Sequence, residues 1–403
     1  MSTEDMNQAG GERLPLAGIR VVEVTHMVMG PTCGMILGDL GAEVIKVEPP
    51  KGDNTRRLLG AGAGFFRTFN RNKKSVALDT ETEEGREALR KLVDTADVFI
   101  ENFKPGRMKS LGLDYETLKK RNPKLIYVSH KGFLAGPYEN RLALDEVVQM
   151  MAGLAYMTGP VGRPLRAGSS VNDIMGGMFG AIGVLAALNE RWKSGVGHEV
   201  QSALFENCVL LSAQHMQQYV VTGEAAAPMP ERISAWAVYD VFEMANGEQL
   251  FVAATGDAQW RALCGLIGRE DLLADSRLAT NNDRVVARPW LLATLRETLR
   301  QIDAKALAAQ LEANNVPFAS IVRPEQLFDD PHLRQSGGLV PLTLEDGSQT
   351  DMPLLPISLD GQRLKPRRPI PKIGEDTREV LLALGYTEAQ IASLQHAAPK
   401  AAA

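Results

Sequence analysis

Short β-branched runs alternate with helical stretches along the first half of the chain. Residues 19–24 and 44–47 are such runs, and the stretch between them is helical in character from Gly30-Pro31 to Gly41. A strand, a helix and a strand within about thirty residues form a βαβ unit, which predicts a parallel sheet with right-handed crossovers. The alternation continues with a helix over 82–94, a strand over 98–100, a helix over 115–120 and a strand over 125–128.

The loops after these strands are where a ligand is expected. In doubly wound sheets the ligand crevice lies beyond the carboxyl ends of the strands. His26 follows the first strand, and the loops 102–106 and 129–132 follow two later ones. These three segments should therefore share one rim of the sheet.

A nicotinamide dinucleotide site is disfavoured at the first of these loops. Gly30, Gly34 and Gly38 are spaced by four residues, which does not match the GxGxxG pattern. Pro31 also removes a backbone N–H that a pyrophosphate would use. In a dinucleotide site Glu48, at the end of the second strand, would bind a ribose hydroxyl. Because the loop disfavours such a site, this role for Glu48 is disfavoured too.

The second half of the chain contains a separate small domain. An apolar helix is predicted over 145–158, and the composition of residues 224–231 is that of a linker. Residues 238–254 form a hairpin pattern in which Asn246-Gly247 favours a type I′ turn. We predict an α+β domain over 225–330, and a last helix over 376–384 that packs on the main body. The other helices expected in this domain cover 258–266, 289–302 and 304–313.

One acidic residue, Asp173, stands at the start of a long uncharged helical run over 174–188. Residues 168–172 are turn and capping residues, so Asp173 lies at or beside a helix N-terminus, where backbone N–H groups and the helix dipole stabilise negative charge. Gly176, Gly180 and Gly183 follow at helical spacing, which predicts close approach of another backbone or of a ligand. From these residues alone, Asp173 is either a functional carboxylate or only the N-cap of its helix.

Composition and charge exclude several classes of function. The 403 residues are 44% hydrophobic and 23% charged, with a net charge of −5, which is typical of a globular chain large enough for two domains. The mild acidity argues against nucleic acid as a partner. The three cysteines and six histidines are scattered without CxxC or HExxH spacing, so no metal site is expected. Residues 1–13 are polar, and the run over 174–188 is shorter than the roughly 18 residues that a membrane span needs. We expect a cytoplasmic protein without a membrane partner.

The densest basic segment of the first half covers residues 67–74. Charge runs are usually solvated turns, and this remains one interpretation. The other is a phosphate clamp, with Phe65, Phe66 and Phe69 supplying apolar surface nearby.

The order of these motifs resembles the class III CoA-transferases, the family of formyl-CoA transferase, crotonobetainyl-CoA transferase and succinate-dependent dicarboxylate transferases. The resemblance extends from Pro15 to about Leu394. Each motif is weak alone, and their order is specific. They are Leu16-Ala-Gly-Ile-Arg-Val-Val, Gly30-Pro31, residues 40–48, Asn70-Arg-Asn-Lys-Lys-Ser, residues 97–106, Leu113-Asp-Tyr, Gly136-Pro137, Asp173 with Gly176-Gly177, and residues 193–200.

The resemblance implies a fold, an assembly and a mechanism. The fold is α/β, with a large Rossmann-like domain over 1–224, the small α+β domain over 225–330, and a C-terminal segment over 331–403 that completes the large domain. Two ring-shaped subunits would interlock in a homodimer. Asp173 would attack an acyl-CoA thioester and carry CoA as an aspartyl-CoA thioester, with acyl-CoA and a small carboxylic acid as substrates and no tightly bound cofactor.

The resemblance also assigns candidate binding residues. Met27 and Val28 would contact CoA through their backbone, Asn102 and Phe103 would lie along its adenine and pantetheine, and four basic residues would be candidates for its phosphates: Lys73, Lys74, Lys104 and Arg107. Backbone N–H groups around Gly176-Gly177, or a loop of the partner subunit, are candidates for stabilising oxyanions. For the acyl group we expect a short dicarboxylate such as succinate paired with a branched C5 acid, held by His26, Arg67 and Arg71.

Departures from the family pattern bear on specificity. Val28 and Leu144 stand where formyl-CoA transferase has glutamine and tyrosine, and its glycine loop is not evident around residues 253–256, so formate or oxalate specificity is doubtful. The 2-methylacyl-CoA racemase branch needs a histidine in a Gly-His-Asp triplet, which here reads Ala143-Leu144-Asp145. Leucine carries no proton, so racemisation should be absent. A non-catalytic acyl-CoA-binding protein is a third possibility.

Overall fold

The chain forms two compact units in a computed structural model that describes residues 14–232 and 234–395. The first unit joins residues up to Ala226 with those from His332 onward, and the second spans Ala227–Pro331. The second unit thus begins and ends within two residues of the small domain predicted over 225–330.

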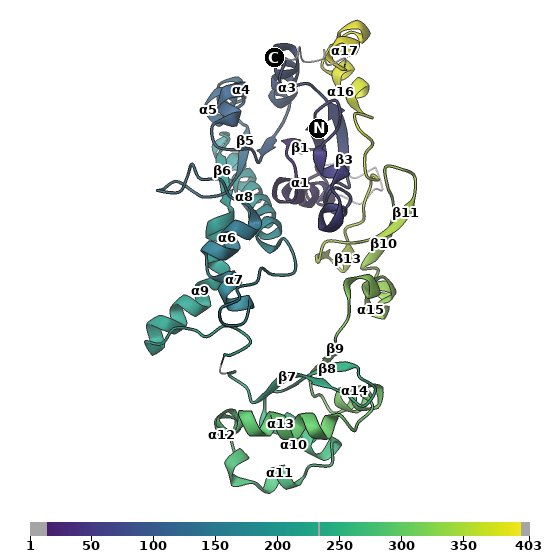
Figure 1. The fold of residues 1–403 in the computed structure, drawn as a ribbon. Coiled ribbons are helices and arrows are strands. Elements are labelled where there is room, and N and C mark those ends of the chain that lie inside the picture. Colours follow the sequence, from purple (N-terminus) through teal and green to yellow (C-terminus); the bar gives the residue numbers. More distant parts are fainter. Residues whose placement is uncertain (1–13, 233, 396–403) are drawn as a thin grey trace. The chain divides into compact units, whose positions relative to one another are not determined.

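A parallel six-stranded sheet organises the first unit (Figure 1). Its order is β3-β2-β1-β4-β5-β6, the doubly wound arrangement that binds ligands beyond the carboxyl ends of its strands. Val22 lies opposite Ile45 on one side and Phe99 on the other, and all three are buried, as expected for a parallel sheet covered on both faces. The prediction of a parallel α/β fold is confirmed. The strands are β1 (Arg20–Val24), β2 (Glu43–Glu48), β3 (Lys73–Ala77), β4 (Val98–Glu101), β5 (Ile126–Lys131) and β6 (Glu199–Ala203).

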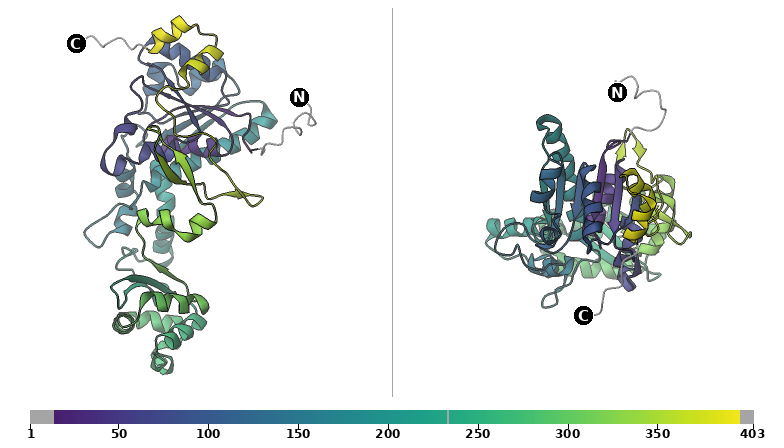
Figure 2. Two further views of the ribbon diagram at one scale, coloured as in Figure 1. Left: turned by 90° about the vertical axis from the view of Figure 1, so that its right-hand side faces the viewer. Right: turned by 90° about the horizontal axis from the view of Figure 1, so that it is seen from above.

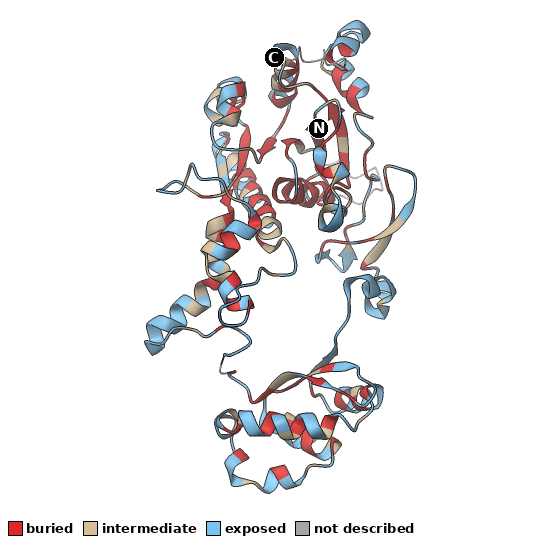
Figure 3. Ribbon diagram, in the orientation of Figure 1, coloured by how far each residue is buried: buried red, intermediate tan, exposed pale blue. Residues whose placement is uncertain are grey.

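Two helices at the centre of this unit bring the candidate site together. Helix α1 (Met29–Asp39) is buried along its whole length, as Figure 3 shows, and it packs against the long helix α8 (Val171–Ser194). The glycines of α8 permit this contact, because a β-carbon on Gly177 would lie 2.6 Å from the Met29 carbonyl oxygen. The predicted close approach of another backbone to this stripe is therefore confirmed.

The remaining helices of the first unit cover the sheet and its carboxyl edge. The prediction of one helix over 145–158 is wrong, because Gly153 adopts a left-handed φ of 82° and divides the segment in two. Before α8 the helices are η1 (Asn54–Arg57), η2 (Gly60–Gly62), α2 (Phe65–Phe69), α3 (Glu83–Asp94), α4 (Arg107–Leu111), α5 (Tyr115–Arg121), α6 (Asp145–Met151) and α7 (Leu154–Thr158), and α9 (Leu204–Thr222) follows β6.

The C-terminal segment completes the first unit. Helices α16 (Thr377–Ala383) and α17 (Glu388–Gln395) lie beside the strands at the β3 edge in both sets of views (Figures 1 and 2). Asp376 accepts the Ser75 N–H, and Thr377 Oγ1 accepts the Ala77 N–H, so this segment satisfies the free edge of β3. Before these helices the segment contains α15 (Pro331–Gln335), β10 (Leu339–Thr343), β11 (Gln349–Pro353), β12 (Ser358–Leu359) and β13 (Gln362–Arg363), which the sequence analysis did not predict.

The second unit is an antiparallel sheet with helices, and it has its own apolar core. Its hairpin confirms the prediction, but the turn is not type I′, because only Gly247 has a left-handed φ and the Met244 N–H donates to the Glu248 carbonyl. This is the three-residue loop with a glycine bulge. The elements are β7 (Val238–Glu243), β8 (Gln249–Ala254), α10 (Asp257–Leu266), α11 (Asp271–Ala274), η3 (Ser276–Leu278), α12 (Asn281–Val286), α13 (Arg288–Leu299), α14 (Ala304–Ala313), β9 (Phe318–Ser320) and η4 (Pro324–Asp329).

Helix α8 is also long and apolar enough to cross a membrane, judged by length and composition, and it alone passes that test within the described part of the chain. It extends beyond the predicted run over 174–188 at both ends. About 44% of its most apolar window is buried inside the unit, where it contacts α1, β5 and β6. The core helix of a globular protein has the same properties, and its packing here is of that kind.

Candidate active site

Asp173 lies in the first turn of α8 and is not the N-cap of this helix. The N-cap is Ser170, which makes no side-chain capping bond. The Asp173 carboxylate accepts no hydrogen bond from any described residue, within 14–232 and 234–395. The interpretation of Asp173 as a simple capping residue is therefore wrong.

The cap of α8 comes instead from Asp145, the first residue of α6. Asp145 Oδ2 accepts the backbone N–H groups of Asn172 at 2.9 Å and Asp173 at 3.1 Å. These are two of the donors that a helix N-terminus leaves without intrahelical partners. The Asp145 carboxylate therefore lies at the positive end of the α8 helix dipole. The sequence analysis expected the Asp173 carboxylate in that position.

The electrostatic surroundings of Asp173 disfavour its charged form. The pKa of Asp173 is raised to about 7, chiefly by burial and also by the neighbouring Asp145 carboxylate, while Arg166 acts in the opposite direction. A carboxylate without hydrogen bonds and with a raised pKa is more basic and less solvated than one on the surface. At neutral pH a large share of it is ionised and available as a nucleophile.

The loop between β1 and α1 brings the carboxyl end of the sheet close to Asp173. A β-carbon on Gly176, one helical turn after Asp173, would lie 2.3 Å from the Met29 methyl carbon, so the starts of α8 and α1 are in contact. Just before α1, Met27 adopts a left-handed φ of 62°, which is uncommon for a residue with a side chain.

Hydrogen bonds hold this loop in its strained conformation. The Asn102 side-chain amide accepts the His26 N–H and donates to the His26 carbonyl, and Thr55 Oγ1 accepts the Met27 N–H at 3.0 Å. Behind the loop, the buried Lys46 ammonium donates to the Thr25 carbonyl at 2.6 Å and pairs with Asp53 at 3.1 Å. Backbone strain held by a surrounding network is frequent at ligand sites.

A cavity of about 340 Å³ opens beyond the carboxyl ends of β1, β2 and β3. Its walls combine apolar residues from several strand ends with the side chains of His26, Met27, Phe103 and Arg107. The His26 and Phe103 rings lie 5.2 Å apart, and Arg107 pairs with Glu81 across the rim. Burial lowers the pKa of His26, so its ring is largely neutral at neutral pH. Of the three segments predicted to share one rim, His26 and the 102–106 loop line this cavity, whereas no residue of 129–132 does. Its volume is that of a site that holds part of a nucleotide.

Several residues expected at the site lie elsewhere. Lys73 is fully buried, and its ammonium donates to Glu23, the Pro31 carbonyl and Asn70, so it has no donor left for a phosphate. Arg71 is 2% exposed and makes a bidentate pair with Asp39, which excludes contact with substrate. The predicted roles of Lys73 in phosphate binding and of Arg71 in substrate binding are therefore wrong, because both side chains are buried and paired in the core.

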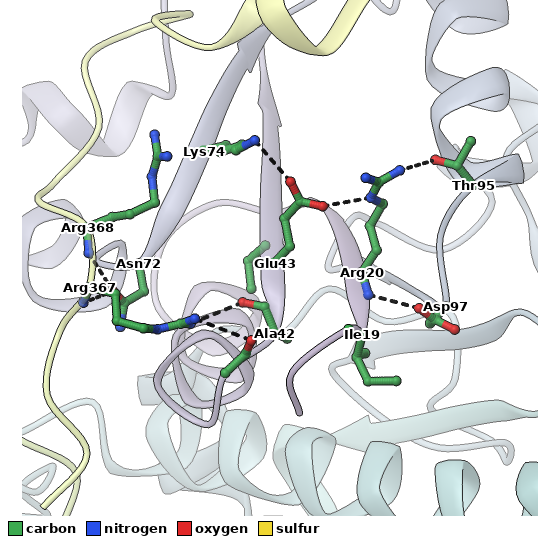
Figure 4. A pocket seen from close by; sticks show the side chains of 13 residues that line it. Ile19, Arg20, Ala42, Glu43, Asn72, Lys74, Thr95, Asp97, Arg367 and Arg368 are labelled. Atoms are coloured by element: carbon green, nitrogen blue, oxygen red, sulfur yellow. Dashed lines mark hydrogen bonds and ion pairs between the residues drawn. The ribbon is translucent and has the colours of Figure 1, made fainter. Parts of the chain in front are cut away.

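Lys74 and Arg67 are accessible but lie away from the cavity. Lys74 pairs with Glu43 and Glu379 in a second cavity of about 450 Å³ at the amino ends of the strands (Figure 4). Because the two ends of a parallel sheet are opposite edges, Lys74 is not placed to bind a ligand of the carboxyl edge. Arg67 pairs with Glu345 and Asp346 of the C-terminal segment.

Four further residues expected at the site differ in burial and in distance from the cavity-lining residues. Val28 is buried at the start of α1, and Lys104 is exposed directly after Phe103. Asn102 shapes the loop through its amide, as described above. Leu144 precedes α6 and is 68% exposed, beside Asp145.

Gly176 and Gly177 are interior residues of α8. The N–H groups of such residues donate to carbonyls four residues earlier. The expectation that these N–H groups stabilise an oxyanion is therefore wrong, and these glycines instead permit helix packing.

Asp145, Gln149 and Arg166 belong to the site but were not recognised from the sequence. Gln149 is fully buried, donates to Asp145 and accepts the Ala167 N–H at 2.8 Å. Arg166 pairs with Glu146 on α6. One indication of this set was present in the sequence, an acid at the start of the helix predicted over 145–158. Within residues 14–232 and 234–395, no group of three or more His, Cys, Asp or Glu side chains is arranged to hold a metal ion.

A doubly wound sheet with a cavity at its carboxyl edge and a partly buried acid one helical contact away is typical of enzymes that bind nucleotide-bearing ligands. The sequence profile described as CoA-transferase family III matches residues 16–377, and the chain belongs to this family. It is a CoA-transferase.

Known relatives are similar over nearly the whole chain. A succinate–glutarate CoA-transferase of Agrobacterium fabrum is 35% identical, over 95% of this chain and 99% of that protein. A succinyl-CoA:mesaconate CoA-transferase of Haloarcula marismortui is 34% identical, over 91% of this chain and 95% of that protein. The crystal structure of a CAIB/BAIF family protein from Brucella suis matches with a TM-score of 0.83 and 35% identity, over 93% of this chain and 100% of that one.

Proposed function

We propose that this enzyme moves CoA between succinyl-CoA and a second short dicarboxylic acid, and that Asp173 carries CoA during the exchange as an aspartyl-CoA thioester. The observation that carries the proposal is the Asp173 carboxylate, which no described residue hydrogen-bonds and whose pKa burial raises to about 7. The relatives named for succinate with glutarate and for succinyl-CoA with mesaconate support the substrate class.

The exchange proceeds in four displacements at carbonyl carbon. An ionised Asp173 oxygen attacks the thioester, the C–S bond breaks, and CoA leaves as a thiolate while a mixed anhydride forms. The thiolate attacks the aspartyl carbonyl and releases the donor acid, which leaves aspartyl-CoA. The acceptor carboxylate then displaces the thiolate, and the thiolate finally attacks the acceptor acyl carbonyl, which yields the new acyl-CoA and free Asp173. One thioester replaces another, so the exchange consumes no ATP.

We assign the nucleotide end of CoA to the cavity beyond β1 to β3. Phe103 and His26 offer ring faces there, and Arg107 and the neighbouring exposed Lys104 offer positive charge for phosphates. The pantetheine arm would follow Met27 and Val28 to the start of α1, where α1 contacts α8 one turn from Asp173. This path connects the cavity with the reactive carboxylate.

The distal carboxylate of a dicarboxylic acyl group needs a cation near Asp173. Arg71 and Arg67 are engaged elsewhere, whereas the charge of Arg166 acts on Asp173. We therefore assign this role to Arg166, with His26 closer to the CoA cavity. Whether the second acid has four or five carbons is decided by the assay below.

The homodimer is part of the proposal. Exposed apolar side chains on α8 and α9 form surface that monomeric proteins usually cover. They include Met178, Ile182, Leu185, Trp192, Leu210, Met216, Tyr219 and Val220. Analytical ultracentrifugation at micromolar concentration should give the mass of a dimer, and a monomer would contradict the interlocked assembly.

The decisive experiment compares the wild type with Asp173→Ala. Succinyl-CoA is incubated with a panel of mono- and dicarboxylates, and new CoA esters are followed by mass spectrometry. We expect transfer to dicarboxylates by the wild type and a loss of about 1,000-fold or more in the variant, because the nucleophile is gone. Trapping with hydroxylamine or borohydride during turnover should modify Asp173. Undiminished transfer by Asp173→Ala would refute the mechanism, and transfer only to monocarboxylates would refute the substrate class.

The racemase alternative can be tested in the same preparation. Leu144 offers no group that exchanges a proton, so a 2-methylacyl-CoA incubated in D₂O should keep its α-hydrogen. Deuterium at the α-carbon would identify a racemase instead.

A further inference from the structure

The Asp173 turn is held from outside its own helix by a pair of buried side chains on α6. Asp145, 7% exposed, accepts the N–H groups of Asn172 and Asp173 through Oδ2, and Gln149, fully buried, donates to Asp145 Oδ1. The Gln149 carbonyl oxygen also accepts the Ala167 N–H at 2.8 Å. The pair therefore fixes both the turn that precedes α8 and the first turn of α8.

This arrangement changes what the Asp173 carboxylate can do. An acidic side chain in the first turn of a helix normally gains stability from free N–H donors at the helix start. Here two of those donors are occupied by Asp145, and Ser170 contributes no side-chain cap. The backbone of Asp173 is thereby fixed while its carboxylate is left without hydrogen bonds.

We propose that Asp145 and Gln149 are positioning residues of the transfer reaction, which occupy the donors at the start of α8 and so hold the Asp173 backbone in place while its carboxylate accepts no hydrogen bond from a described residue. The proposal rests on the proposed function, because it assigns Asp173 as the nucleophile. Asp145 contributes a fixed negative charge next to the nucleophile, and Gln149 fixes the orientation of Asp145.

The charged and titratable groups around Asp173 define the pH readout. From α6 it faces Asp145, with Glu146 beyond it paired to Arg166 of the preceding loop. From α9 the packed groups are Cys208 and Asn207, and from β5 the buried His130 contacts α8 at Gly180. Helix α1 presents Met29 and Thr32, which carry no charge. Asp145 is thus the acidic group whose charge acts on Asp173.

Two substitutions at Asp145 separate charge from geometry. Asp145→Asn keeps an oxygen that accepts from the helix start and removes the negative charge. We expect the acid limb of kcat/KM for the acyl donor, near pH 7 in the wild type, to move to lower pH by about half a unit or more. Asp145→Ala removes both, and we expect kcat to fall about 10- to 100-fold with KM for acyl-CoA within about threefold of the wild type. We expect a higher kcat in Asp145→Asn than in Asp145→Ala, because asparagine keeps the oxygen that accepts from the start of α8.

A matched control is available in the same unit. Asp114 is the N-cap of α5 and accepts the Thr117 N–H at 3.2 Å, so Asp114→Asn makes the same chemical change at a helix start remote from Asp173. It should leave both the pH limb and kcat unchanged. Gln149→Leu should reproduce part of the kcat loss of Asp145→Ala, and it replaces that variant if Asp145→Ala does not fold.

The outcomes distinguish this inference from the proposed function. An unshifted acid limb in Asp145→Asn, together with unchanged kcat in Asp145→Ala or Gln149→Leu, would overturn the positioning role while Asp173-dependent transfer stands. A shift of equal size in Asp114→Asn would also overturn it. If the wild type transfers no CoA and no modification of Asp173 is trapped, the proposed function fails, and the positioning role fails with it.

Discussion

The two ends of the parallel sheet differ in how their charges are satisfied. At the amino ends, Glu43 lies between Arg20 and Lys74, and the Arg367 guanidinium donates to the carbonyls that end α1 (Figure 4). At the carboxyl ends, Met27 is strained, the His26 and Phe103 rings line a cavity, and the Asp173 carboxylate nearby accepts no hydrogen bond from the described part of the chain. The larger cavity is thus the one in which Arg20, Glu43 and Lys74 already pair with one another. Polar groups without partners, rather than volume, mark the candidate functional end.

The sharpest test of this contrast compares adjacent lysines of β3. Lys73→Ala leaves the Glu23 carboxylate buried without its nearest partner and creates a cavity, so we expect a loss of about 3 to 5 kcal/mol of folding stability. Lys74→Ala removes a pair at the partly exposed amino end and should cost at most about 1 kcal/mol. Urea unfolding measures both. Equal losses in the two variants would show that burial does not separate these charges.

The same lysines show which parts of the structure a single sequence reveals. The sheet, the close helix contact and the hairpin were predictable, because periodic apolar positions and glycine spacing are local properties. Lys73 was not, because its partner Glu23 is 50 residues away and belongs to another strand. The sequence of a basic segment does not show whether its side chains are buried in a core or exposed on the surface.

The site was predictable to a similar degree and for the same reason. Turn residues placed Asp173 at a helix start, but its cap, Asp145, lies 28 residues upstream. The capping role that one sequence interpretation gave to Asp173 therefore belongs to Asp145. The short strands β10 and β11 were missed because each has only five residues and contains a proline, so neither shows a clear alternation of apolar and polar positions.

A second prediction uses the stability of Asp173→Asn. Burial raises the pKa of Asp173 from its ordinary value to about 7, so the folded state binds a proton that the unfolded state releases. That contribution to stability is complete below about pH 4 and is lost as pH rises through 7. Asp173→Asn should match the wild type below about pH 4, already exceed it at pH 5, and exceed it by about 4 kcal/mol at pH 8, measured by urea unfolding. A constant difference over this range would place an ordinary, solvated carboxylate at this position.

A third prediction concerns the rim of the carboxyl-end cavity. Arg107→Ala removes a cation from this wall, and we expect KM for acyl-CoA to rise about 10-fold, equivalent to about 1.4 kcal/mol, with little change in thermal midpoint. The measurement is steady-state kinetics with varied acyl-CoA. An unchanged KM would remove Arg107 from the phosphate site.

The smallest expected effect belongs to Arg20→Ala at the opposite end. Arg20 is a matched change, since its side chain is 40% exposed and pairs with one acid, much as the Arg107 side chain is 37% exposed and pairs with Glu81. Exposed pairs contribute about 1 kcal/mol or less, so thermal unfolding should shift by a few degrees at most. KM should not change, because Arg20 lies at the amino ends of the strands. A KM increase in Arg20→Ala as large as in Arg107→Ala would mean that acyl-CoA senses both ends of the sheet, and the distinction between a paired structural end and an unpaired functional end would not hold.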